Sequence, residues 1–290
     1  MKGVFTALIT PFKKSGEVDY AAFEKLLKLQ GDAGIHGIVP CGTTGESATL
    51  NEKEKKKLIE MSVRYFNGSK VKVIAGTGSN NTETTVDLSR WASMQRVDGI
   101  LVVTPYYNRP SQKGLLAHYK AVSEAIDCEL VPYNVPARTG VSFTTETIVK
   151  LGQMKNVTGL KEATANIGWN AELIAALKVS RSKMDLLTGD DPTFLPFLSI
   201  GGAGIISVAS NLIPQVLLEI YNKKNSELFL KWTPLFKSLF IECNPGPIKF
   251  AMNKVYGLPS HTRLPLVKIE PQTEKILLPL IRPVLRGIRD

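Results

Sequence analysis

The chain has 290 residues, of which 43% are apolar and 21% charged, and its formal net charge is +10. This composition is typical of a globular protein, and no apolar stretch approaches the ~20 residues that a membrane-spanning helix needs. The N-terminus enters a strand-like run directly and lacks a signal-peptide pattern, so we expect a cytoplasmic protein with no membrane partner.

The positive charge does not gather into one basic block with interleaved aromatic residues. The lysines between positions 53 and 57 share a predicted helix with Glu52 and Glu54, as on a solvated helix face. We therefore expect no nucleic-acid partner, and the excess of positive charge favours small anionic substrates.

Eight apolar, β-branched runs recur along the chain, with amphipathic helical patterns between most of them. The runs begin near Val4, Gly37, Val71, Gly99, Leu130, Val157, Leu186 and Gly204. The helical patterns include residues 20–33, 52–66, 82–94, 112–125 and 145–151. Strands that alternate with helices predict a parallel sheet, and eight of them fit an α/β fold of the closed (β/α)8 type, the TIM barrel.

Only helical patterns follow the eighth run, over residues 214–221, 226–243, 247–256 and 270–286. We predict a (β/α)8 catalytic barrel over residues 1–223 and a C-terminal helical extension over residues 224–290. The alternative is an open doubly wound sheet, which would carry a glycine-rich phosphate loop after the first strand. Residues 10–14 at that place, Thr-Pro-Phe-Lys-Lys, are not such a loop.

In a barrel, functional residues gather at the C-terminal ends of the strands. Lys161 ends the sixth apolar run. A lysine there can pair with a neighbouring carboxylate such as Glu162, or it can be a desolvated amine that is kept partly neutral for attack on a carbonyl. The residues at the other strand ends favour the second interpretation.

Three further strand ends offer polar groups. The loop from Gly42 to Gly45 can bind a small anion through hydroxyl and backbone N–H groups, or it can be a tight turn. Tyr107 and Tyr133 can pass protons, or they can pack at the barrel rim. Arg138 can hold a carboxylate in a two-pronged hydrogen bond, or it can form a surface salt bridge.

The three histidines and three cysteines lack the spacing of metal ligands, so we expect no metal ion. Asp190 and Asp191 could hold magnesium, but with Pro192 after them a helix cap is the preferred interpretation. Cys41, near the glycine loop, is a candidate nucleophile, although a buried free thiol is the favoured interpretation.

An amine, an anion-binding loop and two tyrosines together fit imine chemistry. In that chemistry the amine attacks a keto group and water leaves. A proton then leaves the adjacent carbon to give an enamine.

Several motifs resemble the signatures of the dihydrodipicolinate synthase/N-acetylneuraminate lyase family. They are Gly42-Thr43-Thr44-Gly45-Glu46, Tyr133-Asn134-Val135-Pro136-Ala137-Arg138-Thr139-Gly140 and Gly159-Leu160-Lys161-Glu162-Ala163. The resemblance continues in order through residues 201–207 and 244–249. The Arg138-Thr139-Gly140 ending and residues 104–110 are most similar to members that condense pyruvate with L-aspartate 4-semialdehyde, on the way to diaminopimelate and lysine.

The resemblance implies the roles of the catalytic residues. Lys161 forms the imine with pyruvate, and Tyr133 passes protons to and from it. Thr43 and Tyr107 extend the proton relay, with Tyr107 reaching in from a neighbouring subunit. The family also implies a lyase that needs no cofactor and a homotetramer built from two tight dimers.

The resemblance also implies how the substrates are bound. Thr43 and Thr44 hold the pyruvate carboxylate, and Arg138 holds the carboxylate of the semialdehyde. Gly189 and Ile206 border the site through their backbones.

Members of the family that lysine inhibits often carry histidines and a glutamate in a lysine-binding cleft. The matching positions here are Glu52, Lys55 and Thr84, whereas Ser47, Ala48, Asn80 and Tyr106 are retained. The charge of Lys55 would repel the ammonium group of a bound lysine, so we expect weak or absent inhibition by lysine.

Two other functions stay open. A sister aldolase would join pyruvate to a sugar-like aldehyde, and Arg138 argues against it because a polyol needs no carboxylate partner. A non-catalytic, effector-binding homologue could share the fold, and the retention of Lys161 with both tyrosines argues against that. Pro132, immediately before Tyr133, is unusual for a strand, and the sequence does not explain it.

Overall fold

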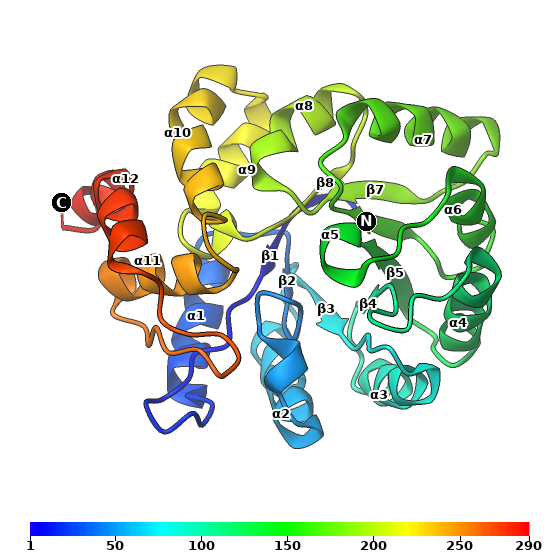
Figure 1. Ribbon diagram of the computed structural model, residues 1–290, viewed down its shortest axis with the longest axis horizontal. Coiled ribbons are helices and arrows are strands. Elements are labelled where there is room, and N and C mark those ends of the chain that lie inside the picture. Colours follow the sequence, from blue (N-terminus) through cyan, green and yellow to red (C-terminus); the bar gives the residue numbers. More distant parts are fainter. Residues whose placement is uncertain (290) are drawn as a thin grey trace. The chain divides into compact units, whose positions relative to one another are not determined.

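The computed structural model describes residues 1–289, with side chains described through residue 285. Its eight strands form a closed parallel barrel in the order β1 to β8 (Figure 1), which confirms the predicted (β/α)8 fold. The strands are β1 (Gly3–Ala7), β2 (Gly37–Val39), β3 (Lys72–Gly76), β4 (Gly99–Val103), β5 (Glu129–Asn134), β6 (Gly159–Glu162), β7 (Asp185–Thr188) and β8 (Gly204–Ser207).

Helices follow the strands along the chain. They are α1 (Tyr20–Asp32), α2 (Glu52–Phe66), α3 (Thr82–Met94), α4 (Gln112–Glu124), α5 (Pro136–Thr139), α6 (Thr145–Leu151), α7 (Ile167–Val179), α8 (Phe194–Ser199), α9 (Pro214–Lys223), α10 (Ser226–Ser238), α11 (Gly246–Tyr256) and α12 (Pro271–Arg289). Three short 3₁₀ turns are η1 (Ser47–Thr49), η2 (Asp191–Thr193) and η3 (Ala209–Asn211). In the described residues, none of the helices has the length and apolar character needed to cross a membrane.

Polar side chains fix where many of these helices begin. The side-chain oxygen of the residue before the helix accepts a hydrogen bond from a backbone N–H of the first turn, which would otherwise lack a partner. These caps are Asp19, Asn51, Asn81, Ser111, Thr144, Asn166 and Asn225. At α2 the cap is reciprocal, because the Glu54 carboxylate accepts from the backbone N–H of Asn51.

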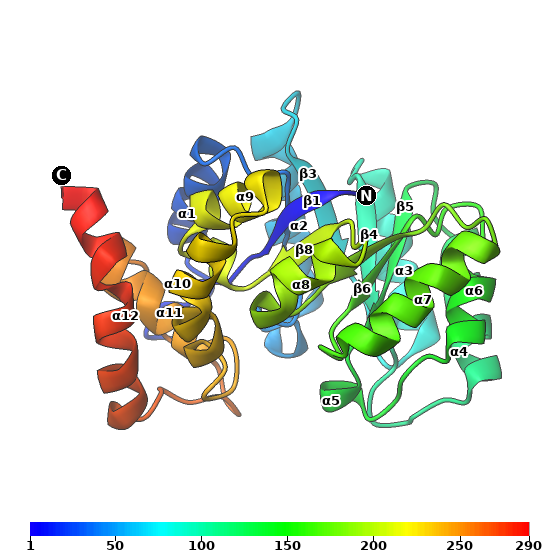
Figure 2. The ribbon, with the colours of Figure 1, turned by 90° about the horizontal axis from the view of Figure 1, so that it is seen from above.

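The described chain divides into two compact units. Unit 1 comprises Met1–Gly3 and Lys72–Ile206, and unit 2 comprises Val4–Val71 and the residues from Ser207 onward. Within unit 1, helices α3, α4, α6 and α7 pack against one another in chain order (Figure 2). The amino group of Met1 is paired with the Asp185 carboxylate at 2.5 Å in the same unit.

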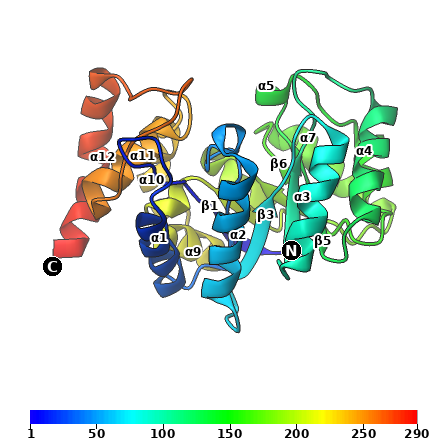
Figure 3. The same ribbon diagram turned by 90° about the horizontal axis from the view of Figure 1, so that it is seen from below.

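In unit 2, α1 and α2 pack side by side (Figure 3), and α10 and α11 both contact α12. Buried amides connect β1 to this unit. The Asn211 side chain bonds to both the N–H of Ile9 and the carbonyl of Ala7, and Gln30 bonds to Thr6 and to the carbonyl of Ser210.

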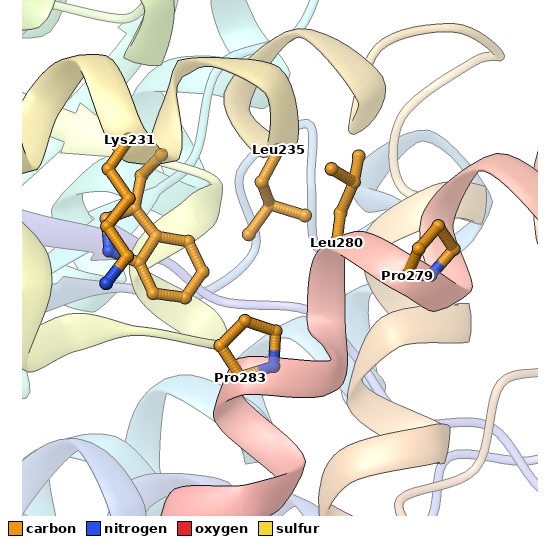
Figure 4. Close-up of a pocket in the computed structure, with 6 residues that line it drawn as sticks. Lys231, Leu235, Pro279, Leu280 and Pro283 are labelled. Carbon is orange, nitrogen blue, oxygen red and sulfur yellow. The ribbon is translucent and has the colours of Figure 1, made fainter.

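A small pocket lies between α10 and α12 (Figure 4). Its lining residues are Lys231, Trp232, Leu235, Pro279, Leu280 and Pro283. Its volume of about 130 Å³ is below the roughly 300–1,000 Å³ that is usual for small-molecule sites. We therefore assign it no ligand.

Pro132 lies where the pairing of β5 with β6 changes register. Leu130 is opposite Val157, whereas Tyr133 is opposite Lys161, so three steps on β5 match four steps on the neighbouring chain. One extra residue is therefore inserted before β6, as in a β-bulge. Proline, which has no N–H to donate, is tolerated at such a place. The bulge explains the unusual proline and brings Lys161 level with Tyr133.

One sequence expectation for the helices was wrong, because the helix predicted over 226–243 ends at Ser238. Helices α7 and α8 were not among the examples of helical patterns named from the sequence. The division into residues 1–223 and 224–290 stays a prediction, and residue 290 lies outside the described residues.

Candidate active site

The buried amine of Lys161 is the centre of the candidate site in unit 1. Lys161 lies on β6 and is 5% exposed, and its Nζ lies 4.1 Å from the centroid of the Tyr133 ring. Burial lowers the pKa of this amine to about 7, while the Asp191 carboxylate raises the pKa and the Arg138 guanidinium lowers it. A large share of the amine is therefore neutral near pH 7, which is the form that attacks a carbonyl.

Glu162 does not serve as the partner of Lys161. Neighbouring residues on a strand point to opposite faces. The Glu162 carboxylate accepts hydrogen bonds from the backbone N–H and hydroxyl of Thr164 at 2.8 Å each and from the Asn134 amide at 3.2 Å. The ion-pair alternative for Lys161 and Glu162 is thus wrong, and the carboxylate has its own set of donors.

Gly189 gives the Lys161 side chain its space. A Cβ atom at position 189 would lie 2.8 Å from Cε of Lys161 and 2.9 Å from Cβ of Ala163, both closer than real contacts. The Gly189 N–H also donates to the carbonyl of Glu162 at 2.6 Å. Any side chain here would displace the amine, so the glycine is required by shape. Ile206, also predicted to border the site, is fully buried on β8.

Arg138 lies on the short helix α5 rather than in an irregular loop. Pro136 starts this helix, and Gly140 ends it in the left-handed conformation with φ of 70°. The carbonyl of Gly140 accepts from Nε of Arg109 at 3.0 Å, and the Thr104 hydroxyl donates to that of Thr139 at 3.1 Å. The turn that carries Arg138 is therefore held by the segment after β4.

Tyr107 projects from unit 1. It is 90% exposed, and its φ of 70° lies in the left-handed region that non-glycine residues rarely adopt. A large aromatic ring in that position is not explained by packing within the chain. The role of Tyr107 in the proton relay therefore stays a prediction.

The predicted anion loop belongs to unit 2. The N–H of Gly45 donates to the carbonyl of Gly42, and the N–H of Glu46 donates to that of Thr43, each at 3.0 Å. Within the described residues, the backbone N–H groups of Thr43 and Thr44 donate to no protein acceptor. Thr43 is partly buried and Thr44 is 3% exposed. Both N–H groups are therefore without a protein acceptor, as the predicted anion-binding role of this loop requires.

The residues of the predicted effector cleft are divided between the units. In unit 2, Ser47 and Ala48 lie on η1, Glu52 is paired with Lys56 at 2.6 Å, and burial lowers the pKa of Lys55. In unit 1, the carbonyl of Asn80 accepts from the Asn108 amide at 2.8 Å, and Tyr106 is partly buried. Their assembly into one cleft stays a prediction.

The structure also bears on the two alternatives of a magnesium site at Asp190 and a nucleophilic Cys41. Asp190 caps η2, because its carboxylate accepts from the N–H and hydroxyl of Thr193 at 3.0 Å and 2.8 Å. Burial raises the pKa of the Cys41 thiol to about 12, which keeps it protonated and a poor nucleophile. Among the described residues, no three or more histidine, cysteine, aspartate or glutamate side chains cluster as metal ligands would.

Two residues of functional interest were missed from the sequence. Asp191, grouped with Asp190 as a cap, is fully buried and acts electrostatically on Lys161. Asn244 was noted only as part of a motif, yet its amide donates to the Thr44 hydroxyl at 2.9 Å across 200 residues of sequence. A contact over that separation leaves no local signal in the sequence.

Comparison with known proteins agrees with this geometry. The model of the dihydrodipicolinate synthetase family matches residues 1–282. A protein of Parvibaculum lavamentivorans named 4-hydroxy-tetrahydrodipicolinate synthase is 43% identical, with 97% of each chain covered. The structure of dihydrodipicolinate synthase from Thermotoga maritima is 39% identical with a TM-score of 0.94, covering 98% of each chain.

A third similar protein was solved as a complex with pyruvate. The dihydrodipicolinate synthase of Acinetobacter baumannii, solved with pyruvate, is 35% identical and superimposes with a TM-score of 0.93 over 98% of each chain. The family model spans nearly all of this sequence, and the named relatives match over more than nine tenths of their length. The chain therefore belongs to the dihydrodipicolinate synthetase family.

Proposed function

We propose that this chain condenses pyruvate with L-aspartate 4-semialdehyde to give 4-hydroxy-tetrahydrodipicolinate, the committed step toward diaminopimelate and lysine. The observation that carries the proposal is the buried amine of Lys161, whose pKa is lowered to about 7 and which lies against the ring of Tyr133. The names of the full-length relatives support the same reaction.

The chemistry begins at Lys161. Its neutral amine attacks the keto carbon of pyruvate, and water leaves to form an imine. The imine withdraws electrons, so a proton leaves the methyl carbon and an enamine forms. The enamine carbon adds to the aldehyde of the second substrate. The amine of that substrate then attacks the imine carbon, closes the ring and releases Lys161. The sum is one water lost and no change of oxidation state, so the reaction requires no redox cofactor.

Protons must move at each of these steps. The contact of the Tyr133 ring with the Lys161 nitrogen, and the pairing of its backbone with β6 at the same level, support this role for Tyr133. In the proposed relay, Thr43 and Tyr107 continue the path to solvent.

The two carboxylates are held by different groups. The backbone N–H groups of Thr43 and Thr44, together with their hydroxyl groups, receive the carboxylate of pyruvate. Arg138 on α5 receives that of the semialdehyde, in a planar pairing that suits a guanidinium. Gly189 and Ile206 border the bound substrates.

The exposed Tyr107 supports an oligomer. An aromatic ring that is 90% exposed and held in the left-handed conformation suits a residue that enters a neighbouring subunit's site. We propose a cytoplasmic homotetramer of two tight dimers. Measurement of the mass in solution, for the natural chain and for Tyr107→Trp, tests the assembly.

The first experiment measures the condensation rate with a coupled downstream reductase. We expect turnover that disappears in Lys161→Ala, together with a pyruvate adduct on Lys161 that borohydride traps and mass spectrometry locates. A trapped adduct without turnover of the semialdehyde would replace the proposal with a sister pyruvate aldolase. Ligand binding without any adduct would indicate a non-catalytic homologue.

Arg138→Ala separates the synthase from the sister aldolases. We expect a large increase in the KM for the semialdehyde and little change in the rate of pyruvate adduct formation. If the variant used its second substrate as well as the natural chain does, the assigned carboxylate partner would be wrong.

We also propose weak or absent feedback inhibition by lysine. Lys55 occupies a position of the predicted effector cleft, and its positive charge opposes the binding of a second ammonium group. A titration of the enzyme activity with lysine tests this proposal. Half-inhibition at a lysine concentration below 1 mM, which corresponds to a binding free energy of about 4 kcal/mol, would contradict the proposal.

A further inference from the structure

The side chain of Asn244 lies buried against the anion loop of unit 2. Asn244 falls between α10 and α11 and is 5% exposed. Its Nδ2 donates to Oγ1 of Thr44 at 2.9 Å. A hydroxyl has one proton and two lone pairs. Because the amide fills one lone pair of Thr44, the hydroxyl proton is left to be donated to another acceptor.

The other end of the amide supports a specific role for this bond. The Oδ1 atom of Asn244 is buried and has no hydrogen-bond partner among the described residues. Buried amide groups in native proteins normally satisfy both ends. Among the described residues, the bond to Thr44 is the hydrogen bond that orients this amide.

A second contact fixes the end of the same loop. Glu46 adopts the left-handed conformation with φ of 54°, and its carboxylate is paired with the ammonium of Lys249 and accepts from the N–H of Arg263 at 3.0 Å. Lys249 is fully buried and also donates to the carbonyl of His261 at 2.7 Å. The loop is thus held at Thr44 and at Glu46 by residues 244–263.

We propose that Asn244 is a positioning residue of the carboxylate-binding loop, which turns the Thr44 hydroxyl proton toward the carboxylate of the keto acid. The inference rests on the proposed function, since it takes Thr44 to bind that carboxylate. Asn244 acts through Thr44 and touches no reacting atom. The C-terminal extension therefore completes the recognition of the first substrate.

The test is the pyruvate dependence of Asn244→Ala. We expect its KM for pyruvate to rise by about tenfold, as for loss of one hydrogen bond to a charged group, with kcat and the KM for the semialdehyde changed by less than about twofold. Asn253→Ala is the matched control, because the Asn253 amide also makes a hydrogen bond in this region, to the carbonyl of Leu258 at 2.9 Å. We expect the control to keep its KM for pyruvate even where its melting temperature falls.

A double-mutant cycle shows whether Asn244 acts through Thr44. In a Thr44→Val background, Asn244→Ala should cause no further rise in the KM for pyruvate. Full additivity of the two changes in KM would overturn the proposal.

If Asn244→Ala does not fold, the nearly isosteric variant Asn244→Asp replaces it. Its carboxylate only accepts, so it draws the Thr44 proton away, and we expect a still larger KM for pyruvate. An unchanged KM would overturn the inference.

The two proposals fail in different ways. If the natural chain forms no borohydride-trapped adduct with pyruvate, the proposed function fails. If the natural chain forms the adduct but Asn244→Ala half-saturates at the same pyruvate concentration as the Asn253→Ala control, only the role of Asn244 fails.

Discussion

Among the residues that the structure describes, the buried lysines are Lys161 and Lys249, and their surroundings differ. Lys161 in unit 1 lies against the ring of Tyr133, whereas Lys249 in unit 2 is paired with the Glu46 carboxylate and with a backbone carbonyl. Burial lowers the pKa of both, to about 7 for Lys161 and to about 8 for Lys249, where the pairing with Glu46 opposes the effect of burial.

The comparison shows that burial alone does not identify a catalytic amine. Both groups lose hydration, but the charge of Lys249 is matched by the Glu46 carboxylate, and its ammonium also donates to the carbonyl of His261. Its nitrogen also lies 4.2 Å from the centroid of the Phe12 ring. An amine used in that way stabilises a loop, whereas the amine of Lys161 is left available for chemistry.

The largest expected effect is on stability, because replacing Lys249 should destabilise the protein much more than replacing Lys161. Lys249→Met leaves the Glu46 carboxylate buried without its cation, so we expect the free energy of unfolding to fall by about 3–5 kcal/mol. Lys161→Met exchanges a desolvated amine for an apolar chain of similar volume and should change the free energy of unfolding by less than about 1.5 kcal/mol. Denaturant unfolding of both variants measures the difference. Equal losses would remove the distinction.

A second expectation concerns the space around Lys161. Gly189→Ala places a Cβ within 2.8 Å of the lysine Cε, and we expect the rate of pyruvate adduct formation to fall about a hundredfold through misplacement of the amine. Gly168→Ala is the control, since its Cβ would meet only Oδ1 of Asn166, at an ordinary 3.5 Å. Similar rates for the two variants would contradict the packing argument.

The third expectation is a pH profile. The folded-state pKa of Lys161 is lowered to about 7, so the amine is protonated and inactive below that pH and neutral above it. We expect the rate of adduct formation to fall about tenfold per pH unit below pH 7 and to level off above it. Stopped-flow measurement with pyruvate tests this. A plateau reached only near pH 10 would mean that the amine is not desolvated in solution.

The smallest effect is a displacement of that profile by neighbouring charges. The Arg138 guanidinium lowers the pKa of Lys161 and the Asp191 carboxylate raises it. Arg138→Ala should therefore move the midpoint to higher pH, and Asp191→Asn should move it to lower pH. Displacement of both in the same direction would exclude a charge effect.

Much of the barrel could be predicted because its elements carry local signals. The helices α2, α3 and α6 begin and end at the predicted residues, since polar caps and an apolar stripe mark them. Helix α7 was not named from the sequence, and its apolar residues surround the helix instead of forming one stripe. Helix α10 stops early although apolar residues continue, and two of these, Phe240 and Ile241, are exposed.

The candidate site could be predicted where its residues lie at the C-terminal ends of predicted strands. Lys161, Tyr133 and Gly189 come together as expected because neighbouring parallel strands bring their ends to one edge. The bulge at Pro132 and the bond from Asn244 to Thr44 could not be foreseen, because each depends on the pairing of distant segments. The family resemblance implied residue roles, which stay predictions, and the structure describes the surroundings of these residues.

The pairing of Glu46 with Lys249 has a consequence for how the protein is made. The two residues are 203 positions apart, so the carboxylate stays hydrated until most of the chain has left the ribosome. A nascent chain that stops before residue 249 lacks the cation that pairs with this carboxylate, so the contact between Glu46 and Lys249 can form only late in synthesis.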